Sequence, residues 1–241
     1  MKNLYEKSKI WFAIVWIVCY VIGASCADEL SMLVNLEKSF TVVFLAIMAV
    51  VAIVWMKKDG RFDEFGLCKA EIKARELLWY IPLIIITSCN LWFGITANLK
   101  VHVAAFYILS MLFVGFLEEI IFRGFLFKAM CENNLKSAII VSSVTFGIGH
   151  FVNLINGSGA ELIPNICQVV SAIAIGFLFV VLFYKTKSLW ACIVSHGVLN
   201  SLSAFAVDIT NAQQIIVSAI VSVTAVLYAL YLLKRIKCHT A

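Results

Sequence analysis

The hydrophobic positions of this 241-residue chain fall into eight long runs, separated by short segments that hold most of its charge. A helix needs about 20 predominantly apolar residues to cross a bilayer core about 30 Å thick, so runs of this length predict membrane-spanning helices. The fold expected from the pattern is an all-α polytopic transmembrane helical bundle. The eight predicted spans are Ile10–Ala27, Ser39–Met56, Leu77–Leu99, His102–Phe127, Ser137–Leu154, Ile166–Tyr184, Leu189–Val207 and Ile215–Leu233.

The basic residues predict how these spans are oriented, because cytoplasmic segments of membrane proteins carry an excess of Lys and Arg. With a cytoplasmic N-terminus, sixteen of the 19 basic residues lie on the cytoplasmic side, Lys38 and Lys100 lie outside, and Arg123 lies within a span. A missed or extra helix would scramble this alternation. We therefore expect both termini in the cytoplasm and an uncleaved first helix rather than a signal peptide.

Composition also indicates a membrane protein and limits its partners. The chain is 63% hydrophobic and 14% charged, with a mean hydropathy of +0.99, whereas soluble domains are about 45–50% apolar and about 25% charged. The net charge of +5 follows from the topology, so we expect a lipid bilayer as partner and no nucleic acid. The eight cysteines are scattered without a C-x-x-C pair, which argues against a disulfide framework or a thiolate metal site.

The chain divides into three predicted parts. Residues 1–100 hold the N-terminal transmembrane helices and a polar segment near residues 57–76, which we expect to lie on the cytoplasmic membrane surface and to contain a short helix-like run. Residues 101–207 hold the spans in which polar side chains gather. Residues 208–241 hold a C-terminal transmembrane helix and a basic tail.

Five ionisable residues remain well inside the predicted spans, namely Glu118, Glu119, Arg123, His150 and His196. One charge in hydrocarbon costs several kcal/mol, by estimates that range from about 3 to above 10. At 1.5 Å per helical residue, Glu118, His150 and His196 lie about 15, 21 and 14 Å from the nearest cytoplasmic lysine of their own span. All three therefore fall in the broad middle of the core, and the group is too costly to serve packing alone.

Spacing within each helix predicts which side chains share a face. Glu119 and Arg123 are four residues apart, the order and separation at which a carboxylate and a guanidinium meet, so we expect a structural ion pair. Glu118 points about 100° away around the helix and needs a partner from another helix, or a proton. His196 and Asn200 are again four residues apart and share one face.

These residue types suit the hydrolysis of an acyl bond. A carboxylate near an imidazole can hold and deprotonate a water, and a second histidine with an amide donor on the same face can hydrogen-bond a developing oxyanion. The alternative chemistry is an open zinc site with Glu118, His150 and His196 as ligands. Because the sequence lacks an H-E-x-x-H motif, we expect no cofactor.

Three motifs, in order along the chain, resemble those of a known family. They are Glu118-Glu119-x-x-x-Arg123, Phe146-x-x-x-His150 and His196-x-x-x-Asn200, within the phrases EEIIFRGFLF, SSVTFGIGHF and ACIVSHGVLN. Together they resemble the CAAX prenyl protease and bacteriocin-processing family of intramembrane glutamic proteases, also called the Abi family. The resemblance covers roughly residues 108–202.

This resemblance implies an all-helical membrane bundle with its site in a conical cavity, and it makes residues 101–207 a CAAX protease-like catalytic domain. The roles that it implies are water activation for Glu118 with His150, oxyanion binding for His196 with Asn200, and support of the site for Glu119 with Arg123. Phe146 enters as a supporting motif position. The expected protein is a multi-pass protein of a bacterial plasma membrane.

The function expected is that of an intramembrane endopeptidase, which hydrolyses a peptide bond of a membrane-associated protein or peptide. CAAX-type processing, bacteriocin or peptide maturation, and self-immunity are the possible settings. One alternative is a non-catalytic bacteriocin-immunity or scaffold membrane protein, in which the polar cluster only fixes helix packing. A transporter with Glu118 and the histidines as a proton relay is disfavoured, because paired interrupted segments in two halves are absent from the sequence.

Overall fold

The structure is a computed structural model that describes residues 1–156 and 159–236, and that part of the chain contains helices but no β-strand. The predicted all-α fold is therefore confirmed. Residues 237–241 of the predicted basic tail, among them Cys238, lie outside the described residues. The other seven cysteines are free thiols.

The helical segments are longest where the chain crosses the bundle. The α-helices are α1 (Lys2–Lys7), α2 (Lys9–Leu33), α3 (Ser39–Lys58), α4 (Ile81–Thr87), α5 (Val101–Glu118), α6 (Lys128–Cys131), α7 (Leu135–Gly149), α8 (Leu162–Thr186), α9 (Trp190–Leu202) and α10 (Asn211–Arg235). Between them lie the 3₁₀ or π segments η1 (Leu78–Tyr80), η2 (Cys89–Leu91), η3 (Glu119–Phe127), η4 (His150–Leu154) and η5 (Ser203–Phe205).

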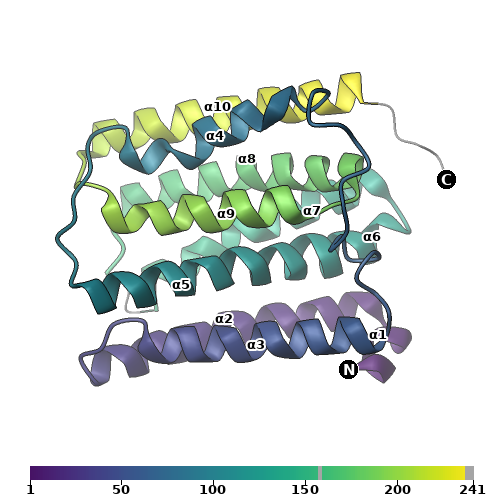
Figure 1. Cartoon of the computed structure of the whole chain (residues 1–241), viewed down its shortest axis with the longest axis horizontal. Helices are drawn as coiled ribbons and strands as arrows, with labels where there is room; N and C mark the ends of the chain where they lie inside the picture. The colour runs from purple at the N-terminus through teal and green to yellow at the C-terminus, as the bar shows by residue number, and fades with distance from the viewer. Residues whose placement is uncertain (157–158, 237–241) are drawn as a thin grey trace.

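The long helices pack side by side with their axes roughly aligned (Figure 1). Helices α2 and α3 form one side of the bundle, α10 and α4 form the opposite side, and α5, α7, α8 and α9 lie between them. The most extensive contacts between helices join α8 with α10, α7 with α8, and α5 with α9. The site described below is built in this middle layer, where α5 continues into η3.

Among the described residues, six helical stretches are long and apolar enough to cross a membrane, and they correspond to six of the eight predicted spans. They are Lys9–Leu33, Ser39–Lys58, Val101–Cys131, Leu135–Leu154, Leu162–Thr186 and Asn211–Arg235. The third and seventh predicted spans instead form shorter helices, Leu78–Thr87 and Trp190–Leu202. By length alone the structure therefore supports six spans rather than eight, although both short helices still run alongside the long ones (Figure 1).

Local backbone features shorten these two helices. Trp79 and Tyr80 adopt φ angles of 53° and 59°, and Pro82, which has no N–H to donate, stands in the first turn of α4. At the far end, the Thr96 N–H donates to the carbonyl of Phe205 at 2.9 Å. The loop after η2 thus pairs with the segment that ends the seventh predicted span. Both segments leave the helical conformation at this point.

The polar segment after α3 differs from its prediction. Residues 59–77 form turns rather than the expected helix-like run, and they are tied to the α8–α9 connection by hydrogen bonds. The Leu189 N–H donates to the carbonyl of Gly66 at 2.8 Å, and the Ser188 hydroxyl donates to the carbonyl of Cys68 at 2.7 Å. Gly66 has a φ of +77°, and a Cβ there would lie 3.1 Å from the Leu189 side chain. Tertiary contacts therefore decide the conformation of this segment.

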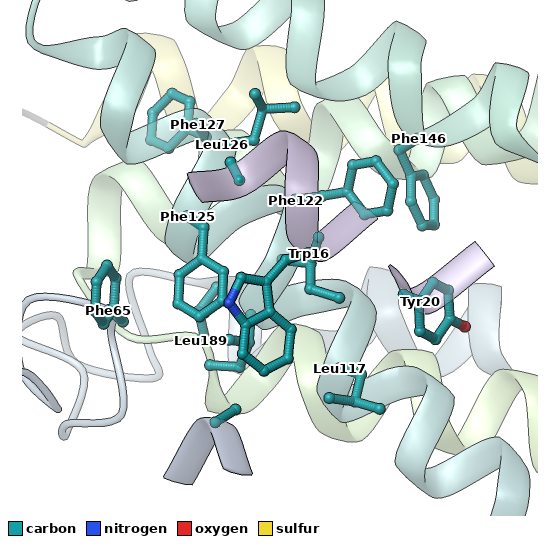
Figure 2. Packing of buried hydrophobic residues seen from close by; sticks show 14 of the residues in the cluster. Trp16, Tyr20, Phe65, Leu117, Phe122, Phe125, Leu126, Phe127, Phe146 and Leu189 are labelled. Atoms are coloured by element: carbon teal, nitrogen blue, oxygen red, sulfur yellow. The ribbon is translucent and has the colours of Figure 1, made fainter. Parts of the chain in front are cut away.

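Aromatic side chains lock the π-helical segment η3 into the bundle. Phe125 of η3 contacts Phe12 and Trp16 of α2, with ring centroids 5.0 and 5.5 Å apart, and it contacts Phe65 at 5.0 Å (Figure 2). All nine residues of η3 are buried. A π-helix is rare and is frequent at functional sites, and here it carries two of the residues that the sequence analysis singled out.

Candidate functional site

A buried ion pair lies at the start of η3. The Arg123 guanidinium donates from Nη1 to Glu119 Oε1 at 3.1 Å, and both side chains are fully buried. The i,i+4 pairing expected from the sequence is present. Because an uncompensated charge in such a place costs several kcal/mol, each partner requires the other.

His196 of α9 extends this pair into a network. Its Nδ1 lies 2.8 Å from Glu119 Oε1, the same oxygen that accepts from Arg123. Its Nε2 lies 3.5 Å from Glu118 Oε2. The imidazole therefore stands between the two adjacent carboxylates and is oriented by Glu119.

Glu118 receives its second contact from α2. The Tyr20 hydroxyl donates to Glu118 Oε1 at 2.7 Å, and the Tyr20 side chain is buried. Glu118 itself is only 12% exposed. A partner from another helix is expected for Glu118 from its position on α5, and the structure supplies two, Tyr20 and His196.

Phe146 of α7 lies between the charged groups. The Arg123 guanidinium stacks over its ring, with Cζ 4.1 Å from the centroid, an arrangement that stabilises a desolvated cation. The same ring meets both histidines edge-on, with its centroid 5.6 Å from that of His150 and 5.6 Å from that of His196. Phe146 thereby sets the separation of the two imidazoles.

His150 begins η4 at the end of α7. Its backbone carbonyl accepts from Asn165 Nδ2 of α8 at 2.9 Å, which fixes the end of the helix against its neighbour. Its ring lies edge-on to that of Phe146, with the centroids 5.6 Å apart. The structure thus places His150 at the edge of the network, joined to it through Phe146.

Glycines let the helices of the site approach closely. A Cβ at Gly115 of α5 would lie 2.6 Å from the backbone nitrogen of Gly197 in α9, so the two backbones touch where they carry Glu118 and His196. A Cβ at Gly147 of α7 would lie 2.9 Å from the backbone nitrogen of Ile173 in α8. Small residues commonly permit such contacts in membrane proteins.

Several polar atoms of the network keep free hydrogen-bonding capacity. Among the described residues, no partner is found for Glu118 Oε2, Glu119 Oε2, Arg123 Nε and Nη2, or Asn165 Oδ1, although all five atoms are buried. Buried polar groups normally have partners. The unpaired oxygens of Glu118 and Glu119 belong to the two carboxylates that contact His196, and they suit the binding of water or of a polar substrate group.

The residues predicted to act together are only partly joined. Glu118, Glu119, Arg123 and His196 form one network, with Phe146 and His150 beside it. Asn200 lies one turn along α9 from His196, and its backbone carbonyl accepts from the Ser203 hydroxyl at 2.6 Å. The described residues show no group of three or more His, Cys, Asp or Glu side chains arranged to hold a metal ion.

Sequence reasoning missed Tyr20 and Asn165. Tyr20 carries a hydroxyl inside the first predicted span, whereas Asn165 directly precedes the sixth predicted span and belongs to α8 in the structure. Asn90, a polar residue within the third predicted span, donates from Nδ2 to the carbonyl of Leu199 at 2.7 Å. It therefore ties η2 to α9.

Comparison with known proteins supports the family resemblance. Residues 100–202 match the family described as "Type II CAAX prenyl endopeptidase Rce1-like". The curated protein "Putative membrane peptidase YdiL" of Bacillus subtilis (strain 168) is 34% identical over 95 residues, which cover 39% of this chain and 34% of that protein. The chain thus matches about a third of the length of this relative. No solved structure matches the chain.

Proposed function

We propose that this chain, a membrane protein whose residues 100–202 belong to the Rce1-like family, is an intramembrane endopeptidase that cleaves a membrane-associated protein or peptide. One observation carries the proposal: the buried network in which His196 lies 3.5 Å from Glu118 and 2.8 Å from Glu119. Such a network contains a carboxylate base, an imidazole and a third group that orients the imidazole. These are the parts that hydrolysis by activated water requires.

In the proposed mechanism Glu118 is the general base. Its carboxylate takes a proton from water, and the hydroxide attacks the carbonyl carbon of the scissile peptide bond. The proton then passes from Glu118 to the departing amide nitrogen as the C–N bond breaks. His150, whose ring lies edge-on to Phe146, holds the water in this proposal.

His196 stabilises the oxyanion in this proposal. With both carboxylates ionised and His196 protonated, the network of Glu118, Glu119, Arg123 and His196 has no net charge, as suits buried groups. His196 then donates from Nδ1 to Glu119 and presents its Nε2–H beside Glu118, where the oxyanion forms. Asn200, one turn further along α9, supplies a second donor to the same oxygen.

The substrate and location are proposed only as classes. The intramembrane position of Glu118 favours a substrate that reaches the bilayer, such as a membrane-associated peptide or a lipid-modified chain end. CAAX-type processing, peptide maturation and self-immunity all satisfy this. The similarity to a Bacillus protein supports a bacterial plasma membrane.

The test compares wild type with Glu118→Gln in a host that lacks the gene. Membrane and secreted peptides from both strains are compared by mass spectrometry, with and without a chelator. We expect a truncated product with wild type alone, and its new terminus identifies the cleavage site. Identical peptide profiles from two equally expressed, folded proteins would refute catalysis and favour the immunity or scaffold alternative.

A further inference from the structure

We propose that Tyr20 is a positioning residue for Glu118, so that the first long helix completes the site of residues 100–202. The inference rests on the proposed function, because it assigns the role of Tyr20 to the reaction of Glu118. Tyr20 lies outside the segment that matches the family. Its hydroxyl nevertheless makes the shortest hydrogen bond that Glu118 receives in the described structure, at 2.7 Å.

The packing of helix α2 holds the Tyr20 hydroxyl in a fixed position. Phe12, Trp16 and Tyr20 are spaced four residues apart and so share one helical face, and all three side chains are buried. Phe12 and Trp16 pack against Phe125 of η3, and Figure 2 shows Tyr20 one turn further along the same face. The aromatic contacts that fix α2 to η3 therefore also fix the distance between Tyr20 and Glu118.

The bond selects between the two oxygens of Glu118. Oε1 is held by Tyr20, whereas Oε2 has no hydrogen-bond partner among the described residues and faces His196 Nε2 at 3.5 Å. Oε2 is thus the oxygen left to take the proton of a water beside His196. A donor to Oε1 also stabilises the ionised carboxylate, the form that a general base requires.

Other charged groups do not replace this contact. Arg123 is directed to Glu119 at 3.1 Å, and His196 approaches the opposite oxygen of Glu118. Without the Tyr20 hydroxyl, Oε1 would lose its donor while remaining buried beside α2, so the carboxylate could rotate away from its working orientation.

The variant Tyr20→Phe removes the hydroxyl and keeps the ring. Tyr228→Phe is the matched control, because Tyr228 is also buried and donates to the carbonyl of Leu77 at 2.7 Å, but it lies on α10 away from the network. Both proteins are reconstituted in lipid nanodiscs, and their unfolding temperatures are compared. The peptide assayed is the one identified by comparing wild type with Glu118→Gln.

We expect Tyr20→Phe to lower kcat by about 10-fold to 100-fold, the range set by a hydrogen bond to a charged group, with KM unchanged. Tyr228→Phe should keep the wild-type kcat. Equal kcat values for wild type and Tyr20→Phe would overturn the proposal, and so would a loss of kcat that Tyr228→Phe shares, since that loss reports stability alone.

Infrared difference spectra provide a readout that is independent of turnover. The carboxylate bands of Glu118 are assigned by their loss in Glu118→Gln, and we expect them to shift in Tyr20→Phe but not in Tyr228→Phe. Unchanged bands would overturn the proposal. If wild type cleaves no peptide, the proposed function fails, and the infrared comparison alone then decides whether Tyr20 holds Glu118.

Discussion

Replacing Gly115 by alanine tests whether the contact between α5 and α9 assembles the site. The new Cβ would lie 2.6 Å from the backbone nitrogen of Gly197 and 2.8 Å from its Cα. Backbone atoms cannot rotate away as a side chain can, so the helices must separate by about 0.8 Å to reach the 3.4 Å at which ordinary contact begins. Overpacking of this kind costs about 1–3 kcal/mol of stability.

The same displacement would break the network. Glu119 follows α5 directly, and His196 precedes Gly197 in α9. If the helices move apart as rigid units along the line of this contact, the distance from His196 Nδ1 to Glu119 Oε1 grows from 2.8 Å to about 3.6 Å, beyond the range of a hydrogen bond. His196 would then lose the group that orients it.

Gly149→Ala is the matched control for this experiment. Gly149 is also a helical glycine beside a histidine of the site, but no atom lies within 4 Å of the Cβ it would gain. We expect Gly115→Ala to lose most peptide cleavage and to unfold at a lower temperature, while Gly149→Ala retains both properties of wild type. A Gly115→Ala protein as active and stable as wild type would refute the reasoning.

Two further predictions concern charged groups. Arg123→Met should lower the free energy of unfolding in SDS titrations by about 3–5 kcal/mol, because it leaves the buried network of Glu118, Glu119 and His196 with an uncompensated negative charge. Adding Glu119→Gln removes that charge and should recover part of the loss; no recovery would contradict the ion-pair account. Burial disfavours ionisation of the Glu64 carboxyl, but hydrogen bonds from Tyr5 and Arg61 outweigh it, so the pKa of Glu64 is lowered from its ordinary 4.5. The ionised Glu64 carboxylate therefore contributes fully to stability above pH 4.5, and this contribution disappears as the pH falls through the lowered pKa of Glu64. The unfolding temperature of wild type should fall more steeply below pH 4.5 than that of Glu64→Gln.

Hydrophobic runs predicted the six long apolar helices of the described residues, but they overestimated the lengths of the third and seventh predicted spans. A hydropathy window counts apolar residues and does not register that Pro82 starts a helix, or that Trp79 and Tyr80 adopt left-handed conformations. In the seventh run, the pairing of Thr96 with Phe205 joins segments more than a hundred residues apart. Such tertiary pairings leave no trace in a local pattern.

The site was predictable where it depends on spacing within one helix. The Glu119–Arg123 pair follows from i,i+4 geometry alone. The contact of His196 with Glu119 does not, because depth in a membrane does not reveal which helices are neighbours. The close approach at Gly115 and Gly197 establishes that neighbourhood, and it becomes visible only when the two helices are placed together.

The role of Tyr20 could not be predicted from the sequence for a different reason. Its ring suits a membrane helix and its hydroxyl suits a buried carboxylate, so the residue fits both an apolar and a polar interpretation. Only the packing of Phe12 and Trp16 against Phe125 places that hydroxyl beside Glu118. The partner of the proposed base therefore follows from aromatic packing rather than from a motif.

Cleavage by the purified protein tests the central claim most directly. Wild type, Glu118→Gln and Gly149→Ala are reconstituted separately in liposomes with the peptide identified in cells, and mass spectrometry follows the new chain end over time. The account predicts product from wild type and Gly149→Ala and none above background from Glu118→Gln. Equal product from wild type and Glu118→Gln, with all three proteins folded, would contradict catalysis by Glu118.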